Sequence, residues 1–127
     1  MFCNQCEQTA KGIACTQIGV CGKTEGVSNL EDLLTHAVQG LSIVAAAGRK
    51  VGVVDKAVDR FTTESIFACL TNVNFDPARF EEMINKAVEL RDQLKTKVEA
   101  AGGTIDSDAA ALTFTPASSV AELEQQG

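Results

Sequence analysis

Two stretches of this sequence repeat apolar residues at helical spacing, and this pattern limits the fold more than any other feature. The first stretch lies within residues 28–48 and the second within residues 77–101. Apolar residues recur at i, i+3, i+4 and i+7, which gives each helix one apolar face. Each face must be buried against another element, so the pattern predicts an all-α fold whose body is an antiparallel helical bundle. The residues are Leu30, Leu33, Leu34, Ala37, Val38, Leu41, Val44 and Ala45, then Phe80, Met83, Ile84, Ala87, Leu90, Leu94, Val98 and Ala101.

Capping signals predict where the two long helices begin and end. Ser28 and Glu31 form a capping box, so the first helix is expected to begin at Ser28. Gly48 is suited to end it. Asp76 can cap the second long helix, which is expected to be the longest. A proline follows at the first helical position, where its missing N–H costs nothing. This helix is expected to end at Gly102–Gly103.

The shorter elements give weaker signals. Residues 53–59 favour a short turn of helix, and Thr62 or Thr63 can cap a further helix that ends near Asn72. Residues 104–127 indicate a weakly ordered tail or the start of a further helix, because a capping box at Ser119 has barely two turns after it. Two interpretations remain open: the segment continues in a longer protein, or it is a frayed terminal turn.

Four of the five cysteines lie within the first 21 residues, spaced Cys3-x2-Cys6-x8-Cys15-x5-Cys21. Residues 1–27 therefore form a loop-rich, glycine-containing segment whose order is expected to come from what the cysteines bind, ahead of the bundle at residues 28–103. Glycines between the thiols allow main-chain N–H groups to approach bound sulfide. Lys11 and Lys23 lie within the motif and can offset the negative charge of a cluster.

Spacing alone leaves three kinds of chemistry open for these thiols. An iron-sulfur cluster is favoured, because one Cys-x2-Cys pair and two spread cysteines can wrap a cluster. A structural zinc site usually has two Cys-x2-Cys pairs, and this chain has one. Unbound or disulfide-paired thiols are the third possibility, although a reducing cytosol disfavours disulfides. Of the other candidate residues, Cys69 lies among apolar residues and is expected to be structural, and the lone His36 is not expected to be a ligand.

Charge and composition exclude several classes of function. The chain has 11 basic and 17 acidic residues, a net charge of −6, which is the wrong sign for binding nucleic acid or anionic membranes. No apolar run reaches the roughly 18 residues of a membrane span, and no export signal opens the sequence. We therefore expect a cytoplasmic protein without nucleic-acid or membrane partners. The common nucleotide, hydrolase and zinc-protease motifs are missing.

The sequence resembles the N-terminal part of the hybrid-cluster protein family, also called hydroxylamine reductases. The resemblance spans most of residues 1–100 and weakens beyond about residue 104. It rests on four segments: Met1-Phe2-Cys3-Asn4-Gln5-Cys6-Glu7-Gln8-Thr9, Gly19-Val20-Cys21-Gly22-Lys23, Leu30-Glu31-Asp32-Leu33-Leu34 and Leu70-Thr71-Asn72-Val73-Asn74-Phe75-Asp76.

The resemblance implies that Cys3, Cys6, Cys15 and Cys21 bind a [4Fe-4S] cluster that relays electrons. In that family, hydroxylamine or nitric oxide is reduced at a hybrid iron-sulfur-oxygen cluster, whose ligands lie in later domains and not in this chain. The chain alone is therefore not expected to be catalytic, and its partner would be the catalytic domains or a redox partner protein. Two alternatives are a standalone small iron-sulfur electron carrier and a zinc-stapled interaction module. The sequence does not indicate an oligomeric state.

Overall fold

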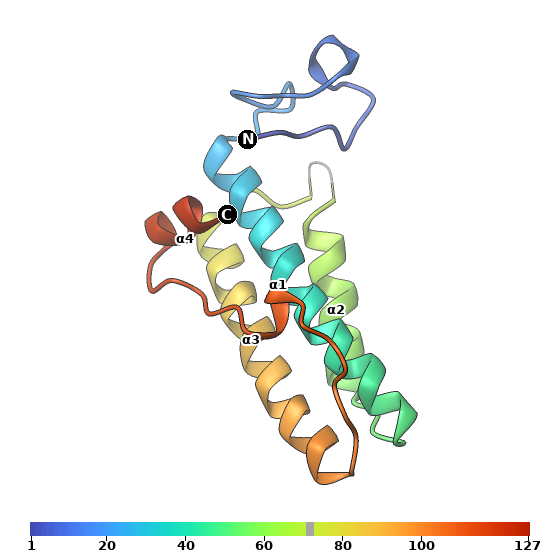
Figure 1. The fold of residues 1–127 in the computed structure, drawn as a ribbon. Helices are drawn as coiled ribbons and strands as arrows, with labels where there is room; N and C mark the ends of the chain where they lie inside the picture. The colour runs from blue at the N-terminus through green and yellow to red at the C-terminus, as the bar shows by residue number, and fades with distance from the viewer. Residues whose placement is uncertain (71–72) are drawn as a thin grey trace.

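Three long helices form the body of the computed structural model, α1 (Glu25–Lys50), α2 (Lys56–Ala68) and α3 (Pro77–Ala100) (Figure 1). The structure describes residues 1–70 and 73–127. Consecutive helices run in opposite directions, so α1 and α3 lie side by side and parallel (Figure 1). Within the described residues there is no strand, only an isolated bridge between Cys3 and Cys15. The predicted all-α fold is confirmed.

The core lies mainly between α1 and α3 and follows the two apolar faces. One cluster of buried side chains lies near the start of α1 and a second lies nearer its end. Burying a large apolar side chain contributes about 1.5–3 kcal/mol, so these faces supply most of the driving force for folding. Fully buried examples are Leu30, Leu34, Phe80 and Ile84 in the first cluster, and Leu41, Val44 and Val98 in the second.

The bounds predicted for α1 are wrong at both ends. Thr24, not Ser28, is the N-cap: its hydroxyl accepts a hydrogen bond from the Val27 N–H at 3.2 Å. Ser28 is buried inside the helix. The helix continues past Gly48 to Lys50, and the left-handed residue that follows it is Gly52, with φ 76°. With 26 residues, α1 is longer than α3, which has 24, so the prediction that the helix capped by Asp76 is the longest is wrong. Local pattern matching favoured the capping box, but the Thr24 side chain already accepts from an N–H group of the first turn, that of Val27.

The region between the long helices forms one helix, whereas the sequence predicted two pieces. Asp55 caps α2 by accepting from the N–H groups of Ala57 and Val58. Thr63 does not cap a helix; it lies inside one, and its hydroxyl donates to the Asp59 carbonyl at 3.1 Å. The helix ends at Ala68. The predicted end near Asn72 lies outside the described residues.

The capping signals for the last two helices are confirmed. Asp76 caps α3, with proline at the first helical position, and the Ser119 hydroxyl accepts from the Glu122 N–H at the start of α4 (Val120–Gln126). Between them, residues 101–119 run back along the bundle through a 3-10 turn, η2 (Ala110–Leu112) (Figure 1). Leu123 of α4 is fully buried in the first core cluster.

Arg91 fixes this returning segment to α3. Its side chain is buried, and its guanidinium donates to the carbonyls of Ala111 at 3.0 Å and Phe114 at 2.8 Å.

Across the described residues, every helix falls short of the length and apolar content that crossing a membrane requires.

Candidate metal centre

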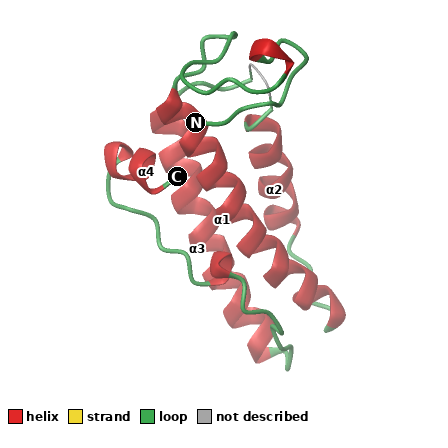
Figure 2. Cartoon of the chain, turned by 45° about the horizontal axis from the view of Figure 1, so that its top comes forward, coloured by secondary structure: helices red, strands yellow, loops and turns green. Residues whose placement is uncertain are grey.

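The four N-terminal cysteines all lie in one segment, residues 1–24, which we call the cysteine loop. It folds across the end of the bundle at which α1 begins (Figure 2). Cys3 and Cys15 exchange two backbone hydrogen bonds, with N–O distances of 3.0 and 2.8 Å. A 3-10 turn, η1 (Ala10–Gly12), lies between them. The terminal ammonium of Met1 pairs with Glu25 of α1 at 2.6 Å. The start of the chain is therefore tied both to the loop and to the bundle.

Glycines hold the last part of the loop in a tight turn around Cys21. The Gly22 N–H donates to the Gly19 carbonyl at 2.8 Å, and Gly22 has φ 89°, which favours glycine. A Cβ placed on Gly19 would lie 2.9 Å from the Cys21 sulfur. Only glycine leaves this sulfur unobstructed, so the residue type at position 19 follows from the position of the thiol.

Cys15 is the most buried of the four, and its sulfur accepts a hydrogen bond from the Ala10 N–H at 3.5 Å. Hydrogen bonding from the main chain at Ala10 and then Val20 lowers the pKa of Cys15, and the charge of Lys23 acts in the same direction. The thiolate is the form that binds iron or zinc. The loop therefore favours the metal-binding form of Cys15.

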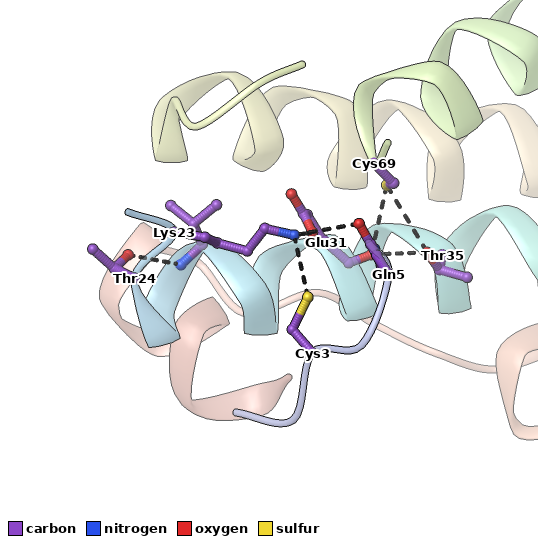
Figure 3. Close-up of polar contacts among 8 residues, drawn as sticks. Cys3, Gln5, Lys23, Thr24, Glu31, Thr35 and Cys69 are labelled. Atoms are coloured by element: carbon purple, nitrogen blue, oxygen red, sulfur yellow. Dashed lines mark hydrogen bonds and ion pairs between the residues drawn. The ribbon is translucent and has the colours of Figure 1, made fainter. Parts of the chain in front are cut away.

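Lys23 carries a fully buried ammonium that faces the thiols. Its Nζ lies 2.5 Å from Glu31 Oε2, 3.5 Å from Gln5 Oε1 and 3.8 Å from Cys3 Sγ (Figure 3). Burial lowers the pKa of Lys23, but the hydrogen bond and charge of Glu31, with the charges of Cys3 and Cys21, raise it overall. The result is a fixed positive charge against the cysteine loop. Lys11, the other lysine of the motif, is exposed.

Glu31 and Gln5 are contributors that the sequence pattern did not single out. Glu31 projects from α1, is 2% exposed, and leaves Oε1 as the single buried side-chain polar atom without a partner among the described residues. Burial raises the pKa of Glu31, and Lys23 opposes that shift. Its position was a usable signal: Glu31 follows Val27 by four residues and precedes Leu34 by three, which places an acid on the apolar face.

The arrangement fits an anionic, sulfur-ligated group. The donors to the sulfurs of Cys15 and Cys3 are main-chain N–H groups and the Lys23 ammonium, and all of them stabilise negative charge there. Each thiolate of a [4Fe-4S] cluster binds a different iron, so such ligands are spaced more widely than those of one ion. Across residues 1–70 and 73–127, no three His, Cys, Asp or Glu side chains are grouped to hold a single metal ion. Whether the four cysteines are the ligands stays a prediction.

Cys69 and His36 have surroundings different from those of the four cysteines. Cys69 is half-buried at the end of α2, where its thiol donates to the Glu31 carbonyl at 3.7 Å. Burial raises the pKa of Cys69 to about 11, so this thiol is neutral near pH 7. The His36 ring packs edge-on against Phe114, with centroids 5.4 Å apart.

A cavity of about 720 Å³ opens beside Cys69, between α1 and α2, and reaches Gln5 of the cysteine loop. Its walls are mostly apolar, for example Val38, Ile43 and Ile66, and none of the described residues that line it carries a charged side chain. Among the described residues of the lining, the titratable side chain is that of Cys69.

Fold and loop together define a class of protein: an all-α domain with four cysteines in one loop at the end where α1 begins. The chain belongs to the Prismane/CO dehydrogenase family, whose model matches residues 1–125.

Three relatives, each named hydroxylamine reductase, show how much of such a protein the chain spans. It is 56% identical to the protein of Syntrophobacter fumaroxidans over all of its 127 residues. The chain is 50% identical to the Methanocella arvoryzae protein over all 127 residues of the chain. It is 44% identical to the Desulfitobacterium hafniense strain Y51 protein over 126 residues. It spans 23% of the length of each of these curated relatives.

Proposed function

We propose that this chain is the N-terminal iron-sulfur domain of a hybrid-cluster reductase, a protein that reduces hydroxylamine to ammonia, or nitric oxide. The observation that carries the proposal is identity of 44–56% to proteins named hydroxylamine reductase along essentially the entire chain. The cysteine loop lies within the aligned residues. The reducing centre, a hybrid iron-sulfur-oxygen cluster, lies in the larger part of such a protein that this chain does not span.

Cys3, Cys6, Cys15 and Cys21 would hold a [4Fe-4S] cluster. When bound, such a cluster accepts and donates single electrons. The chain's own residues prepare the loop for it: Ala10 favours the thiolate of Cys15, and Lys23 holds a positive charge at Cys3. Both contacts act on sulfur, which is where hydrogen bonds and charge tune such a group.

The role in this proposal is electron relay, with the catalytic domains or a redox partner protein as the acceptor. A cytoplasmic location belongs to the same proposal, because a cluster of thiols kept free for metal suits a reducing compartment.

Metal and sulfide analysis of anaerobically purified protein tests the proposal. We expect about four irons and four acid-labile sulfides per chain, and a reversible one-electron reduction in a spectroscopic titration. One zinc without sulfide would contradict the proposal and favour a zinc-stapled interaction module.

Two cysteine variants test the ligand set. Cys15→Ala should lose the cluster or keep an oxygen-sensitive remnant, because one iron loses its thiolate. Cys69→Ala is the matched control, since it removes a thiol from a helix end outside the loop, and it should keep the wild-type iron content. Loss of iron from Cys69→Ala would refute the assignment.

A further inference from the structure

Glu31 is a buried charged residue that the proposed function does not use. It lies on α1, outside the cysteine loop, and its carboxylate contacts the Lys23 ammonium at 2.5 Å. The two side chains are 1% and 2% exposed. An ion pair this deeply buried loses much of its Coulombic gain to desolvation, so it is weak evidence for stability alone. The geometry instead suggests a role in placing the lysine.

Lys23 has three N–H donors and contacts three acceptors among the described residues, of which Glu31 is the nearest. The other two, Gln5 and Cys3, lie 3.5 and 3.8 Å away, and both belong to the cysteine loop (Figure 3). Only Glu31 comes from a helix, and that helix is packed into the core. A lysine ammonium is strongly hydrated and has a flexible stem, so without an anchor it turns towards water.

We propose that Glu31 is a positioning residue that anchors the Lys23 ammonium against Cys3 and thereby raises the reduction potential of the cluster. The inference rests on the proposed function, because it requires the cluster at the cysteine loop. Reduction adds one negative charge to the cluster. A positive charge held near a ligand sulfur stabilises the reduced form more than the oxidised form, and this raises the potential.

The sign of the change separates positioning from a simple charge effect. Glu31 is itself an acid, so a role through charge alone predicts that its removal raises the potential. A positioning role predicts the reverse, because the ammonium leaves Cys3 when its anchor is lost. The two roles therefore give opposite results in the same experiment.

The first experiment is a potentiometric titration of the cluster. Its absorption and electron paramagnetic resonance spectra monitor the reduction. Glu31→Met removes the carboxylate and keeps a side chain of similar length, and it should lower the potential below that of the wild type. Asp32→Asn is the matched control, because Asp32 is the next residue, is exposed and is not one of the three partners of Lys23. It should leave the potential unchanged or raise it. A Glu31→Met potential equal to or above the wild-type value would overturn the inference.

The second experiment does not depend on the cluster. Lysine acetylation of the cluster-free protein, measured peptide by peptide, should modify Lys23 many-fold more slowly than the exposed Lys11. Glu31→Gln, which keeps the shape and removes the charge, should increase the Lys23 rate severalfold and leave the Lys11 rate unchanged. Equal protection of Lys23 in both proteins would overturn the inference.

The two experiments separate the possible failures. If the wild type binds no iron-sulfur cluster, the proposed function fails, while acetylation still tests whether Glu31 anchors Lys23. If Glu31→Met does not fold, the Lys23 acetylation rate of the isosteric Glu31→Gln variant still tests whether Glu31 anchors Lys23. If the wild type holds its cluster and Glu31→Met keeps the wild-type potential, only the inference fails.

Discussion

The surroundings of Cys69 hold its thiol in the neutral form. The thiol lies next to Glu31 and donates a hydrogen bond to the backbone carbonyl of that residue. Burial is the main cause of its raised pKa of about 11, and the Thr35 hydroxyl opposes it with a weak hydrogen bond at 3.9 Å. Because the thiolate is the reactive species, the chemistry of Cys69 is suppressed over the physiological pH range.

This environment predicts the pH dependence of alkylation at Cys69. In cluster-free protein, the iodoacetamide rate at Cys69 should keep rising with pH towards about 11, because the thiolate fraction grows over that range. Peptide mass spectrometry at a series of pH values measures it, with free cysteine as the reference. A plateau near pH 9 would show that burial does not control this thiol.

At the scale of single residues, the sequence predicted a loop that carries the four cysteines and two lysines that could offset charge there, of which Lys23 contacts Cys3 and Lys11 is exposed. It did not predict the role of Glu31, because Ser28 and Glu31 match a capping box and that local explanation is complete in itself. The side chain of Glu31 instead reaches Lys23, in the loop that precedes α1. Only the tertiary fold decides whether the Glu31 carboxylate contacts the Ser28 N–H or the Lys23 ammonium.

Among the elements, α2 depends on one residue at its start. The Asp55 carboxylate accepts from the N–H of Ala57 at 3.0 Å and pairs with Lys97 of α3 at 3.0 Å. The hydrogen bond to Lys97, with those to Val58 and Ala57, lowers the pKa of Asp55. A lowered folded pKa stabilises the protein above the unfolded value of about 3.9, and this stability is lost as pH falls through the folded pKa.

Asp55→Asn should therefore lower the Tm at pH 7 and have less effect near pH 3. Asparagine still caps a helix, so the variant isolates the charge, and we expect a fall of roughly a few degrees. Thermal unfolding at both pH values measures it. Asp106→Asn, in the exposed loop before η2, is the control and should not reproduce this difference. An equal Tm change at both pH values would contradict the assigned role.

The packing of η2 on α1 depends on Gly40. A Cβ there would overlap the Ala111 carbonyl oxygen and lie 2.8 Å from its carbon. Gly40→Ala should destabilise the protein by about 1–3 kcal/mol, although alanine is the better helix former by about 1 kcal/mol. Urea unfolding measures the change. Gln39→Ala, at the exposed neighbouring position, should be neutral, and a more stable Gly40→Ala would contradict the close packing.

Element boundaries were predictable where one capping signal had no competitor. Asp76 before a proline and Ser119 before Glu122 each have one possible reading, and both helices begin there. At the start of α1 the sequence predicted Ser28 as the cap, and the structure has Thr24, four residues earlier, in that role. In α2, threonines resembled a second start because their side chains also bond within helices. Those choices depend on contacts distant in sequence.

On the scale of the whole molecule, the core and the cysteine loop are separate. Neither hydrophobic cluster includes any of the four loop cysteines, and a chain of 127 residues can bury about two thirds of its unfolded surface. The bundle should therefore fold without a cluster.

A variant with all four loop cysteines changed to serine tests this separation. It should keep the helical circular dichroism of the wild type and a cooperative thermal transition, because the buried faces of α1 and α3 are untouched. Iron should be absent from it. Loss of the helical signal would show that the bundle depends on the loop.

The backbone bridge between Cys3 and Cys15 also bears on how a ligand would be captured. Residues that exchange both hydrogen bonds in an antiparallel pair have Cα atoms roughly 5.5 Å apart, and their side chains lie on the same side. Two of the four thiols are thus brought together by the main chain itself, twelve residues apart in sequence. If the loop binds the proposed cluster, part of the entropy of gathering these two donor atoms is lost on folding and not on binding.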